Sequence, residues 1–404
     1  MKSVVRAFKG SLRWRLMITV LGAGLAALLA FLGLNLRSQI EMNLYDLAYV
    51  DIYGDVLLTS TDGRRQRKLI DRSRCPATSR LVWSPAADRL ACLGRANRDS
   101  LSDSHSILAV ADIAGRMITD MKSVTDFAWS PSGRSMAYGL GIDLGEPTRF
   151  YVADAEGRIH EQFDGLSWGV AWSPDESALA YTDLSGDLVI FDMRTKNRQR
   201  LGPGTILAWV RNDLVLIGID RRVADIGEYD IYEAYLLDLR DRKRTRFELL
   251  DDSTQFWVSP AHDDPFIVVY VREGGDQLSI VHLTPLRMNR VKGSMINSAG
   301  SHHVVGGGIL AYSRDGSQVL WADLGRESPT AIYRMLASGT AVTKIGTVPP
   351  GAVRFSDSLT QVAYVTLDDK PTLWTALIDG RQARRIGRFY PESHFGDFSW
   401  RPRK

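Results

Sequence analysis

The chain has 404 residues, of which 45% are hydrophobic and 24% are charged, and its formal net charge at pH 7 is +3. Residues 1–37 hold six of the 50 basic residues and none of the 47 acidic ones, so the remainder carries 44 basic against 47 acidic residues. The basic excess therefore belongs to the amino-terminal segment. The rest of the chain lacks the positive field that attracts nucleic acid, and nucleic-acid binding is excluded on this ground.

The amino-terminal segment is predicted to anchor the chain in a membrane. Residues 1–15 form a basic tail without acids, and residues 16–36 contain no charge. As a helix these 21 residues would span about 31 Å, enough to cross a bilayer. The positive-inside rule places the tail in the cytoplasm and everything after the linker 37–46 outside it, in the periplasm or at the cell surface. A cleaved signal peptide is the alternative, although its apolar core is normally shorter.

Small residues interrupt this apolar span. Gly22-Ala23-Gly24 resembles the start of a dinucleotide fingerprint, but no strand precedes it. Small residues in a membrane helix permit close helix packing, which would allow a helix-mediated homo- or hetero-oligomer.

A phrase of the form aromatic-Ser-Pro recurs along the rest of the chain. Nine residues after most of its copies comes a second large or sulfur-containing residue, as with Trp172 and Tyr181. A repeat of forty-odd residues with four predicted strands is typical of a β-propeller blade. The eight equivalent anchor positions are Trp83, Trp129, Trp172, Trp209, Val258, Tyr312, Phe355 and Trp400.

The letters around each anchor predict two strands joined by a tight turn. Pro presets φ for the first central position of a turn, and Ser and Asp side chains hydrogen-bond the local backbone. The phrase resembles the repeat of the TolB-type β-propeller family, with Trp172-Ser-Pro-Asp and Leu179-Ala-Tyr181 as the closest copy. The resemblance covers about residues 45–404 and lacks the TolB amino-terminal domain. It implies the fold without selecting a function, because similar repeats occur in dipeptidyl-peptidase-type propellers and in pectin-degrading lyases.

Eight anchors predict an all-β, eight-bladed β-propeller over residues 47–404. Seven blades is the alternative if the irregular stretch 209–312 is divided differently. No anchor precedes the strand at Ala48-Tyr49, so the carboxy-terminal strand 397–402 is expected to complete the first blade and close the ring.

The two faces of such a propeller are expected to differ. Short turns fall on one face, and the short linker would place this face, together with Arg401–Lys404, near the membrane. Longer and more variable connections, such as 218–230, fall on the opposite face, where binding residues usually reside. Tyr and Arg are frequent interface anchors. We therefore predict a contact patch for a protein partner; simple drift in unconstrained loops is the other explanation. The patch residues are Arg221, Arg222, Tyr229 and Tyr232.

No catalytic, cofactor or metal site is predicted. Gly165–Gly169 matches the G-x-S-x-G nucleophile motif, but no helix follows it, so an inter-blade loop is expected. The seven histidines form no spaced ligand pair, and acidic turns such as 154–157 are explained by turn chemistry. Cys92 occupies a position that Tyr or Trp fills in four other blades, so we interpret it as a buried core thiol. A Cys75–Cys92 disulfide is the alternative, which an oxidising compartment would permit.

These observations predict a single-pass membrane protein whose extracytoplasmic propeller is a non-enzymatic protein-interaction scaffold without a cofactor. A subunit of a larger membrane complex, and a lyase or hydrolase with its site at the central channel, are the two alternatives.

Overall fold

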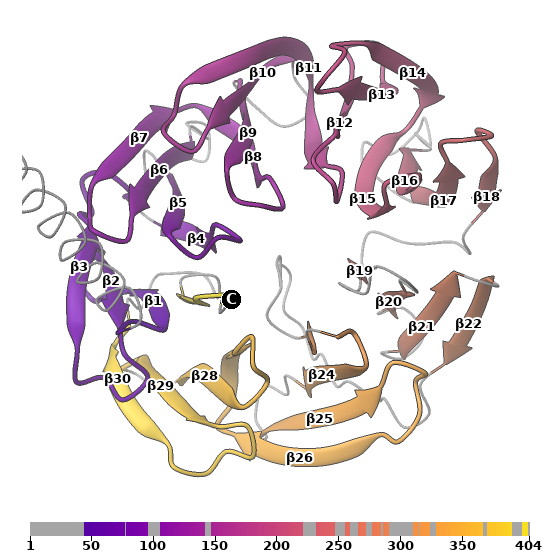
Figure 1. The fold of residues 1–404 in the computed structure, drawn as a ribbon. Helices are drawn as coiled ribbons and strands as arrows, with labels where there is room; N and C mark the ends of the chain where they lie inside the picture. The colour runs from indigo at the N-terminus through magenta and orange to yellow at the C-terminus, as the bar shows by residue number, and fades with distance from the viewer. Residues whose placement is uncertain are drawn as a thin grey trace, which may run out of the picture. The chain divides into compact units, whose positions relative to one another are not determined.

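A computed structural model describes residues 44–402 with gaps at 77, 96–105, 142–146, 221–231, 247–254, 259–265, 272–276, 284–285, 291–309, 314, 324–328, 367–369 and 390–397. Asp46–Lys404 is one compact unit. The regular structure of its described residues consists of antiparallel β-strands, and Figure 1 shows their sheets following one another in chain order. The prediction of an all-β propeller is confirmed.

Six sheets of this unit have four strands each and one has seven. In the first sheet the carboxy-terminal strand β31 (Phe398–Trp400) pairs with β1 (Leu47–Val50), which is followed by β2 (Val56–Thr59) and β3 (Gln66–Ile70). The second sheet contains β4 (Thr78–Trp83), β5 (Arg89–Arg95), β6 (Ser106–Asp112) and β7 (Met117–Lys122). The seven-stranded sheet contains β8 (Val124–Trp129), β9 (Ser135–Leu140), β10 (Pro147–Asp154), β11 (Ile159–Trp172), β12 (Ala178–Thr182), β13 (Asp187–Asp192) and β14 (Arg198–Pro203).

The other four sheets follow the same order of strands. The next two are β15 (Thr205–Arg211), β16 (Leu214–Asp220), β17 (Tyr232–Asp238) and β18 (Arg244–Arg246), then β19 (Gln255–Val258), β20 (Phe266–Val271), β21 (Gln277–Leu283) and β22 (Leu286–Arg290). The last two are β23 (Leu310–Tyr312), β24 (Gln318–Asp323), β25 (Thr330–Leu336) and β26 (Thr343–Val348), then β27 (Gly351–Phe355), β28 (Gln361–Thr366), β29 (Thr372–Leu377) and β30 (Arg384–Arg388).

Strand β11 is long because it belongs to two neighbouring units. Its first half pairs with β10 and its second half with β12, with an irregular register between Leu166 and Val170. The Gly165–Gly169 motif lies inside this crossing. The expected loop is therefore a continuous strand, in which Gly169 adopts a φ of 127° that favours glycine. A nucleophile elbow requires a strand–turn–helix, and no helix follows here.

Where a Ser follows the anchor in the described residues, it clamps the next turn. In the turn after Trp172, the Ser173 amide donates to the Ala178 carbonyl and the Ala178 amide donates to Ser173 Oγ, each at 2.9 Å. The Glu176 amide closes the turn by donating to the Ser173 carbonyl, and Glu176 adopts a left-handed φ of 62°. This double clamp explains why the phrase requires Ser beside the aromatic residue. The same hydroxyl contact recurs at Ser84, Ser130, Ser313 and Ser356.

The repeated Trp joins neighbouring units through its indole N–H. Trp129 donates to the carbonyl of Val82 at 3.3 Å, and Trp172 donates to the carbonyl of Ala128 at 3.3 Å. Each acceptor directly precedes the anchor of the preceding unit. The remaining members of this indole belt are Trp83 to Ser399 (3.2 Å), Trp209 to Ala171 (3.1 Å) and Trp400 to Arg354 (2.9 Å).

Apolar side chains fill the space between adjacent sheets. One cluster joins Leu47 and Tyr49 of β1 to Val365 and Leu373 of the β27–β30 sheet, with Phe398 of β31 beside them. All five side chains are at most 5% exposed. Burial of this kind holds the first and last sheets of the chain together, because it removes their apolar surface from water.

Cys75 and Cys92 form a disulfide bond. Both are fully buried, so the expectation that Cys92 lies in the core is correct, but its interpretation as a free thiol is wrong. The physical reason is that the connection before β4 folds tightly onto β5. A Cβ placed on Gly94 of β5 would lie 2.3 Å from the carbonyl oxygen of Pro76. Only glycine permits this approach.

The predicted membrane helix, residues 16–36, lies outside the described residues, as do the basic tail and most of the linker. Within the described part of the chain, no helix has the length and apolar character needed to cross a membrane.

Candidate functional site

The anchors and strand directions define two faces of the propeller. We call the face with the turns 84–88, 130–134 and 173–177 the turn face, and the face at the other ends of these strands the loop face. Both chain ends of the propeller lie on the turn face. The Arg401 amide donates to the Asp46 carbonyl at 2.8 Å, and Arg401 Nε donates to the carbonyl of Ala87 at 2.7 Å, within the turn 84–88.

The predicted contact patch belongs to the β16–β17 connection. Tyr232 is the first residue of β17 and pairs with Asp220, the last residue of β16, at the loop-face end of this hairpin. Arg221, Arg222 and Tyr229 lie outside the described residues. The patch therefore stays a prediction, with one of its four residues placed at the edge of the loop face.

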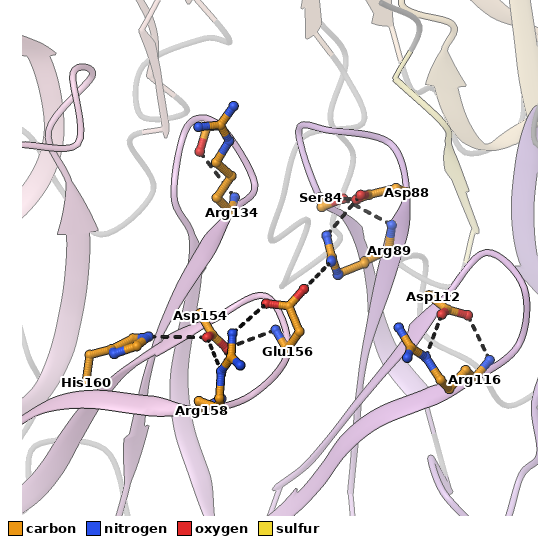
Figure 2. Close-up of polar contacts among 11 residues, drawn as sticks. Ser84, Asp88, Arg89, Asp112, Arg116, Arg134, Asp154, Glu156, Arg158 and His160 are labelled. Atoms are coloured by element: carbon orange, nitrogen blue, oxygen red, sulfur yellow. Dashed lines mark hydrogen bonds and ion pairs between the residues drawn. The ribbon is translucent and has the colours of Figure 1, made fainter. Parts of the chain in front are cut away.

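The turn face carries a polar network that joins two neighbouring units (Figure 2). Arg89 donates to Asp88 Oδ2 at 2.9 Å and to Glu156 Oε1 at 3.2 Å. Glu156 belongs to the β10–β11 turn of the next unit, and its Oε2 lies 3.6 Å from Arg158 Nη2. The side chain of Arg89 is only 15% exposed, so its ion pairs are less screened than ordinary surface pairs. Ser84 extends the network by donating to Asp88 at 3.0 Å.

Asp154 forms the other end of this network. Its Oδ1 accepts the amides of Glu156 and Arg158, and its Oδ2 lies 2.7 Å from Arg158 Nε and 3.3 Å from His160 Nε2. Burial raises the pKa of Asp154, but the hydrogen bonds from Arg158 and the turn amides outweigh it and lower the pKa to about 2. The carboxylate is therefore ionised at neutral pH and acts as a turn cap.

The same arrangement repeats around the turn face. In the β6–β7 turn, Asp112 accepts the Arg116 amide at 2.8 Å and its guanidinium at 3.0 Å. In the β17–β18 turn, the side-chain hydrogen bond from Arg240 lowers the pKa of Asp238 to about 2. These Asp–Arg pairs close hairpins and are solvated at the surface. These pairs have a structural role: each carboxylate accepts hydrogen bonds from backbone amides of the turn, and the guanidinium neutralises the charge of that carboxylate.

Toward the loop face, Asp126 is a charged group that the sequence did not single out. Its Oδ1 accepts the Phe127 amide at 2.8 Å and its Oδ2 accepts the Val170 amide at 2.6 Å, so it joins β8 to β11. Burial raises the pKa of Asp126, and the two amide hydrogen bonds oppose this rise. A single Asp in a strand gives no sequence signal for this bridge, because Val170 belongs to the next unit.

Two further pairs of opposite charges lie near the loop face. Asp183 is 6% exposed, and its Oδ2 lies 2.8 Å from Arg200 Nε. Arg149 and Asp164 face each other across β10 and β11 at 2.9 Å. Within the described ranges, no three His, Cys, Asp or Glu side chains converge in a way that could hold a metal ion.

No protein-family model matches the chain, and no curated protein matches it in sequence. Solved structures do resemble it. Dipeptidyl peptidase 4 from Porphyromonas gingivalis matches with a TM-score of 0.53 and 10% identity over 87% of this chain and 59% of its own. A structure described as the eukaryotic initiation factor matches with a TM-score of 0.51 and 13% identity over 89% of this chain and 98% of its own.

TolB from Acinetobacter baumannii is also among the similar structures, with a TM-score of 0.35 and 14% identity over 76% of this chain and 81% of its own. At these identities the likeness concerns the fold alone. The two structures with TM-scores above 0.5 therefore support a β-propeller fold for the chain, and this fold does not by itself select a function.

Proposed function

We propose that this protein is a membrane-anchored, extracytoplasmic β-propeller that acts as a non-enzymatic protein-interaction module. The observation that carries the proposal is the asymmetry of the two faces. The turn face is built from short, clamped turns, whereas the strand ends that flank the longest connections, including 96–105, 221–231 and 291–309, all lie on the loop face. Variable loops on a rigid frame are where binding residues concentrate.

The frame proposed here has eight blades. Six four-stranded sheets supply six of them, and the two halves of the seven-stranded sheet, which share β11, supply the other two. Each of these units begins with a strand that carries one of the eight anchors. A frame of this kind is suited to presenting loops, because its sheets are fastened to each other by the indole belt and by buried apolar clusters.

The disulfide supports the placement outside the cytoplasm. Disulfides persist in oxidising compartments and are rare in the cytosol, where thiols are kept reduced. Together with the basic tail and the apolar span 16–36, the Cys75–Cys92 bond favours a propeller on the far side of the membrane. The test is to quench intact cells in acid, unfold the protein in denaturant that contains a maleimide, with or without prior reduction, and measure the mass added. We expect modification only after reduction; modification without reduction would refute this placement.

The path of the chain determines which face of the propeller would be turned toward the membrane. Residues 37–46 would connect the membrane span to Asp46 on the turn face, where the carboxy-terminal Arg401 also lies. A linker this short keeps the turn face toward the bilayer and turns the loop face away from it. The partner would therefore bind from the aqueous side, with Arg221, Arg222, Tyr229 and Tyr232 in the contact.

Purification from native membranes in a mild detergent, with mass spectrometry of co-eluting proteins, tests the interaction. We expect a discrete partner that is lost when these four residues are replaced by Ala. The matched control replaces four arginines of the turn face by Ala and should retain the partner: Arg116, Arg134, Arg158 and Arg194. Fixed stoichiometry would identify a subunit of a larger membrane complex. A monomer without any partner would contradict the proposal and favour an enzyme with its site at the channel.

A further inference from the structure

Four arginines from opposite ends of the chain meet where the last and first sheets adjoin. The β2–β3 turn packs onto the β27–β30 sheet: Gln66 Nε2 donates to the Ile386 carbonyl at 2.8 Å, and Thr375 Oγ1 donates to the Thr61 carbonyl at 2.6 Å. A Cβ placed on Gly63 would lie 3.2 Å from the Arg385 carbonyl oxygen. The seam arginines, which these contacts bring together, are Arg64, Arg65, Arg384 and Arg385.

The seam arginines are exposed and carry an excess of positive charge. Asp62 is the acid beside them: a hydrogen bond from Ser60 lowers its pKa, and the charges of Arg64 and Arg384 add to this effect. Arg64 Nε lies 3.7 Å from Asp62 Oδ2. No carboxylate of the described residues forms an ion pair with Arg65, Arg384 or Arg385.

This arrangement differs from the other hairpins of the turn face. On the other hairpins, a guanidinium nitrogen lies within 3.0 Å of a carboxylate oxygen of an Asp on the same hairpin, so the positive charge is neutralised locally. The arginines paired in this way are Arg116, Arg158, Arg240 and Arg381. At the seam, only one of the four guanidinium groups, that of Arg64, lies within 4.0 Å of a carboxylate of the described residues. The turn geometry does not require this excess, because the contacts that lock the seam use backbone carbonyls, a Gln and a Thr.

The seam lies beside the point where the chain reaches the propeller. Asp46 precedes β1, its amide donates to the Thr59 carbonyl at 3.0 Å, and its Oδ2 accepts the Thr61 amide at 3.4 Å. The linker 37–46 can extend about 35 Å at most. A membrane anchored at residue 36 would therefore hold the seam within reach of the bilayer surface at all times, which raises the effective concentration of lipid headgroups around it.

We propose that the seam arginines bind anionic lipid headgroups of the membrane that anchors the chain, an inference that rests on the proposed anchor. The guanidinium fork matches phosphate oxygens in a bidentate geometry. Basic groups near an anionic surface are attracted within about one Debye length, roughly 10 Å. The contact sets the tilt of the propeller, with the seam side lowered onto the bilayer and the loop face directed outward.

The test is hydrogen exchange of the full-length protein in nanodiscs of phosphatidylcholine alone or mixed with phosphatidylglycerol in equal parts. We expect amides 60–68 and 381–388 to exchange about fivefold more slowly in the mixed discs. The double variant R384E/R385E should lose this difference. The control R242E/K243E, with the same charge change on the β17–β18 hairpin of the turn face, should keep it, and amides 238–246 should not respond to lipid in the wild type.

Each negative outcome identifies which part of the proposal is wrong. Failure of the chain to enter either disc overturns the anchor, and the lipid contact falls with it. Entry into both discs with equal exchange at residues 60–68 and 381–388 overturns the lipid contact alone. Equal protection by inorganic phosphate in phosphatidylcholine discs assigns the site to free phosphate and overturns the lipid source.

Discussion

Replacement of Trp172 by Phe tests the indole belt that joins the sheets. Trp172 is 8% exposed, and its Nε1 donates to the Ala128 carbonyl of the preceding unit at 3.3 Å. Phe keeps an aromatic ring in the same position but has no N–H to donate. The variant therefore removes one hydrogen bond between neighbouring units while it preserves most of the packing.

Two contributions set the expected loss of stability. A buried hydrogen bond contributes about 1 kcal/mol net. The smaller ring of Phe buries less apolar surface, which costs roughly 1 kcal/mol at about 25 cal/mol per Å². We expect Trp172→Phe to lower the free energy of unfolding by about 2 kcal/mol, measured by urea unfolding followed by circular dichroism.

Trp374 provides the matched control. It stacks on Tyr364, with ring centroids 6.5 Å apart, but its buried Nε1 has no hydrogen-bond partner among the residues that the structure describes. Trp374→Phe loses ring surface and also removes an unsatisfied donor, so the two effects oppose each other. We expect its free energy of unfolding to fall less than that of Trp172→Phe, by about 1 kcal/mol or more. Equal destabilisation of the Trp172 and Trp374 variants would refute the role of the indole hydrogen bond.

Three further outcomes are expected. The Cys75→Ser/Cys92→Ser variant should lose about 3 kcal/mol in chemical unfolding, and reductant should destabilise the wild type alone; an equal response of both proteins would contradict the disulfide. Arg240 depresses the pKa of Asp238 to about 2, so this carboxylate stabilises the fold above pH 4 or so and the benefit fades as the pH falls toward 2. Asp238→Asn should therefore be less stable than the wild type at pH 7, and the gap should close as the pH falls to about 2; a gap independent of pH would show that the charge is not involved. Gly346→Ala should destabilise strongly, because the new Cβ would meet the backbone of the β29–β30 turn at 2.6 Å; thermal unfolding at the wild-type temperature would show that the two sheets can separate locally.

The fold could be predicted because the repeat encodes contacts that recur in most of the units. An aromatic residue at the end of a first strand, followed by Ser, specifies both the indole contact and the hydroxyl clamp, as at Trp172 and Ser173. Both contacts depend on short sequence spacing or on a fixed period. Position in the repeat was therefore sufficient to place Cys92 in the core, where it is fully buried.

The remaining features depend on contacts that no spacing encodes. The bond from Cys92 to Cys75 requires the connection before β4 to lie on β5, and Gly94 is the one local residue type that would have signalled this approach. The sequence did not predict that the seam arginines form a cluster, because Gln66 and Ile386, which hold the seam together, are 320 residues apart. Ring closure alone brings them into contact.

The β11 crossing was missed for a different reason. Gly and Ser in the Gly165–Gly169 motif favour a loop by composition, yet β10 and β12 both pair with this segment and keep it extended. Tertiary pairing overrides local propensity here. The predicted contact patch, with only Tyr232 placed, still stands as a prediction.

Site-specific photocrosslinking in native membranes tests the central claim most directly. A photoreactive phenylalanine analogue would replace Tyr232 at the edge of the loop face or, in a second protein, Arg134, which is exposed on the turn face. We predict one discrete protein adduct from position 232 and none from position 134. An adduct from position 134 alone, or none from position 232, would contradict an interaction module that works through its loop face.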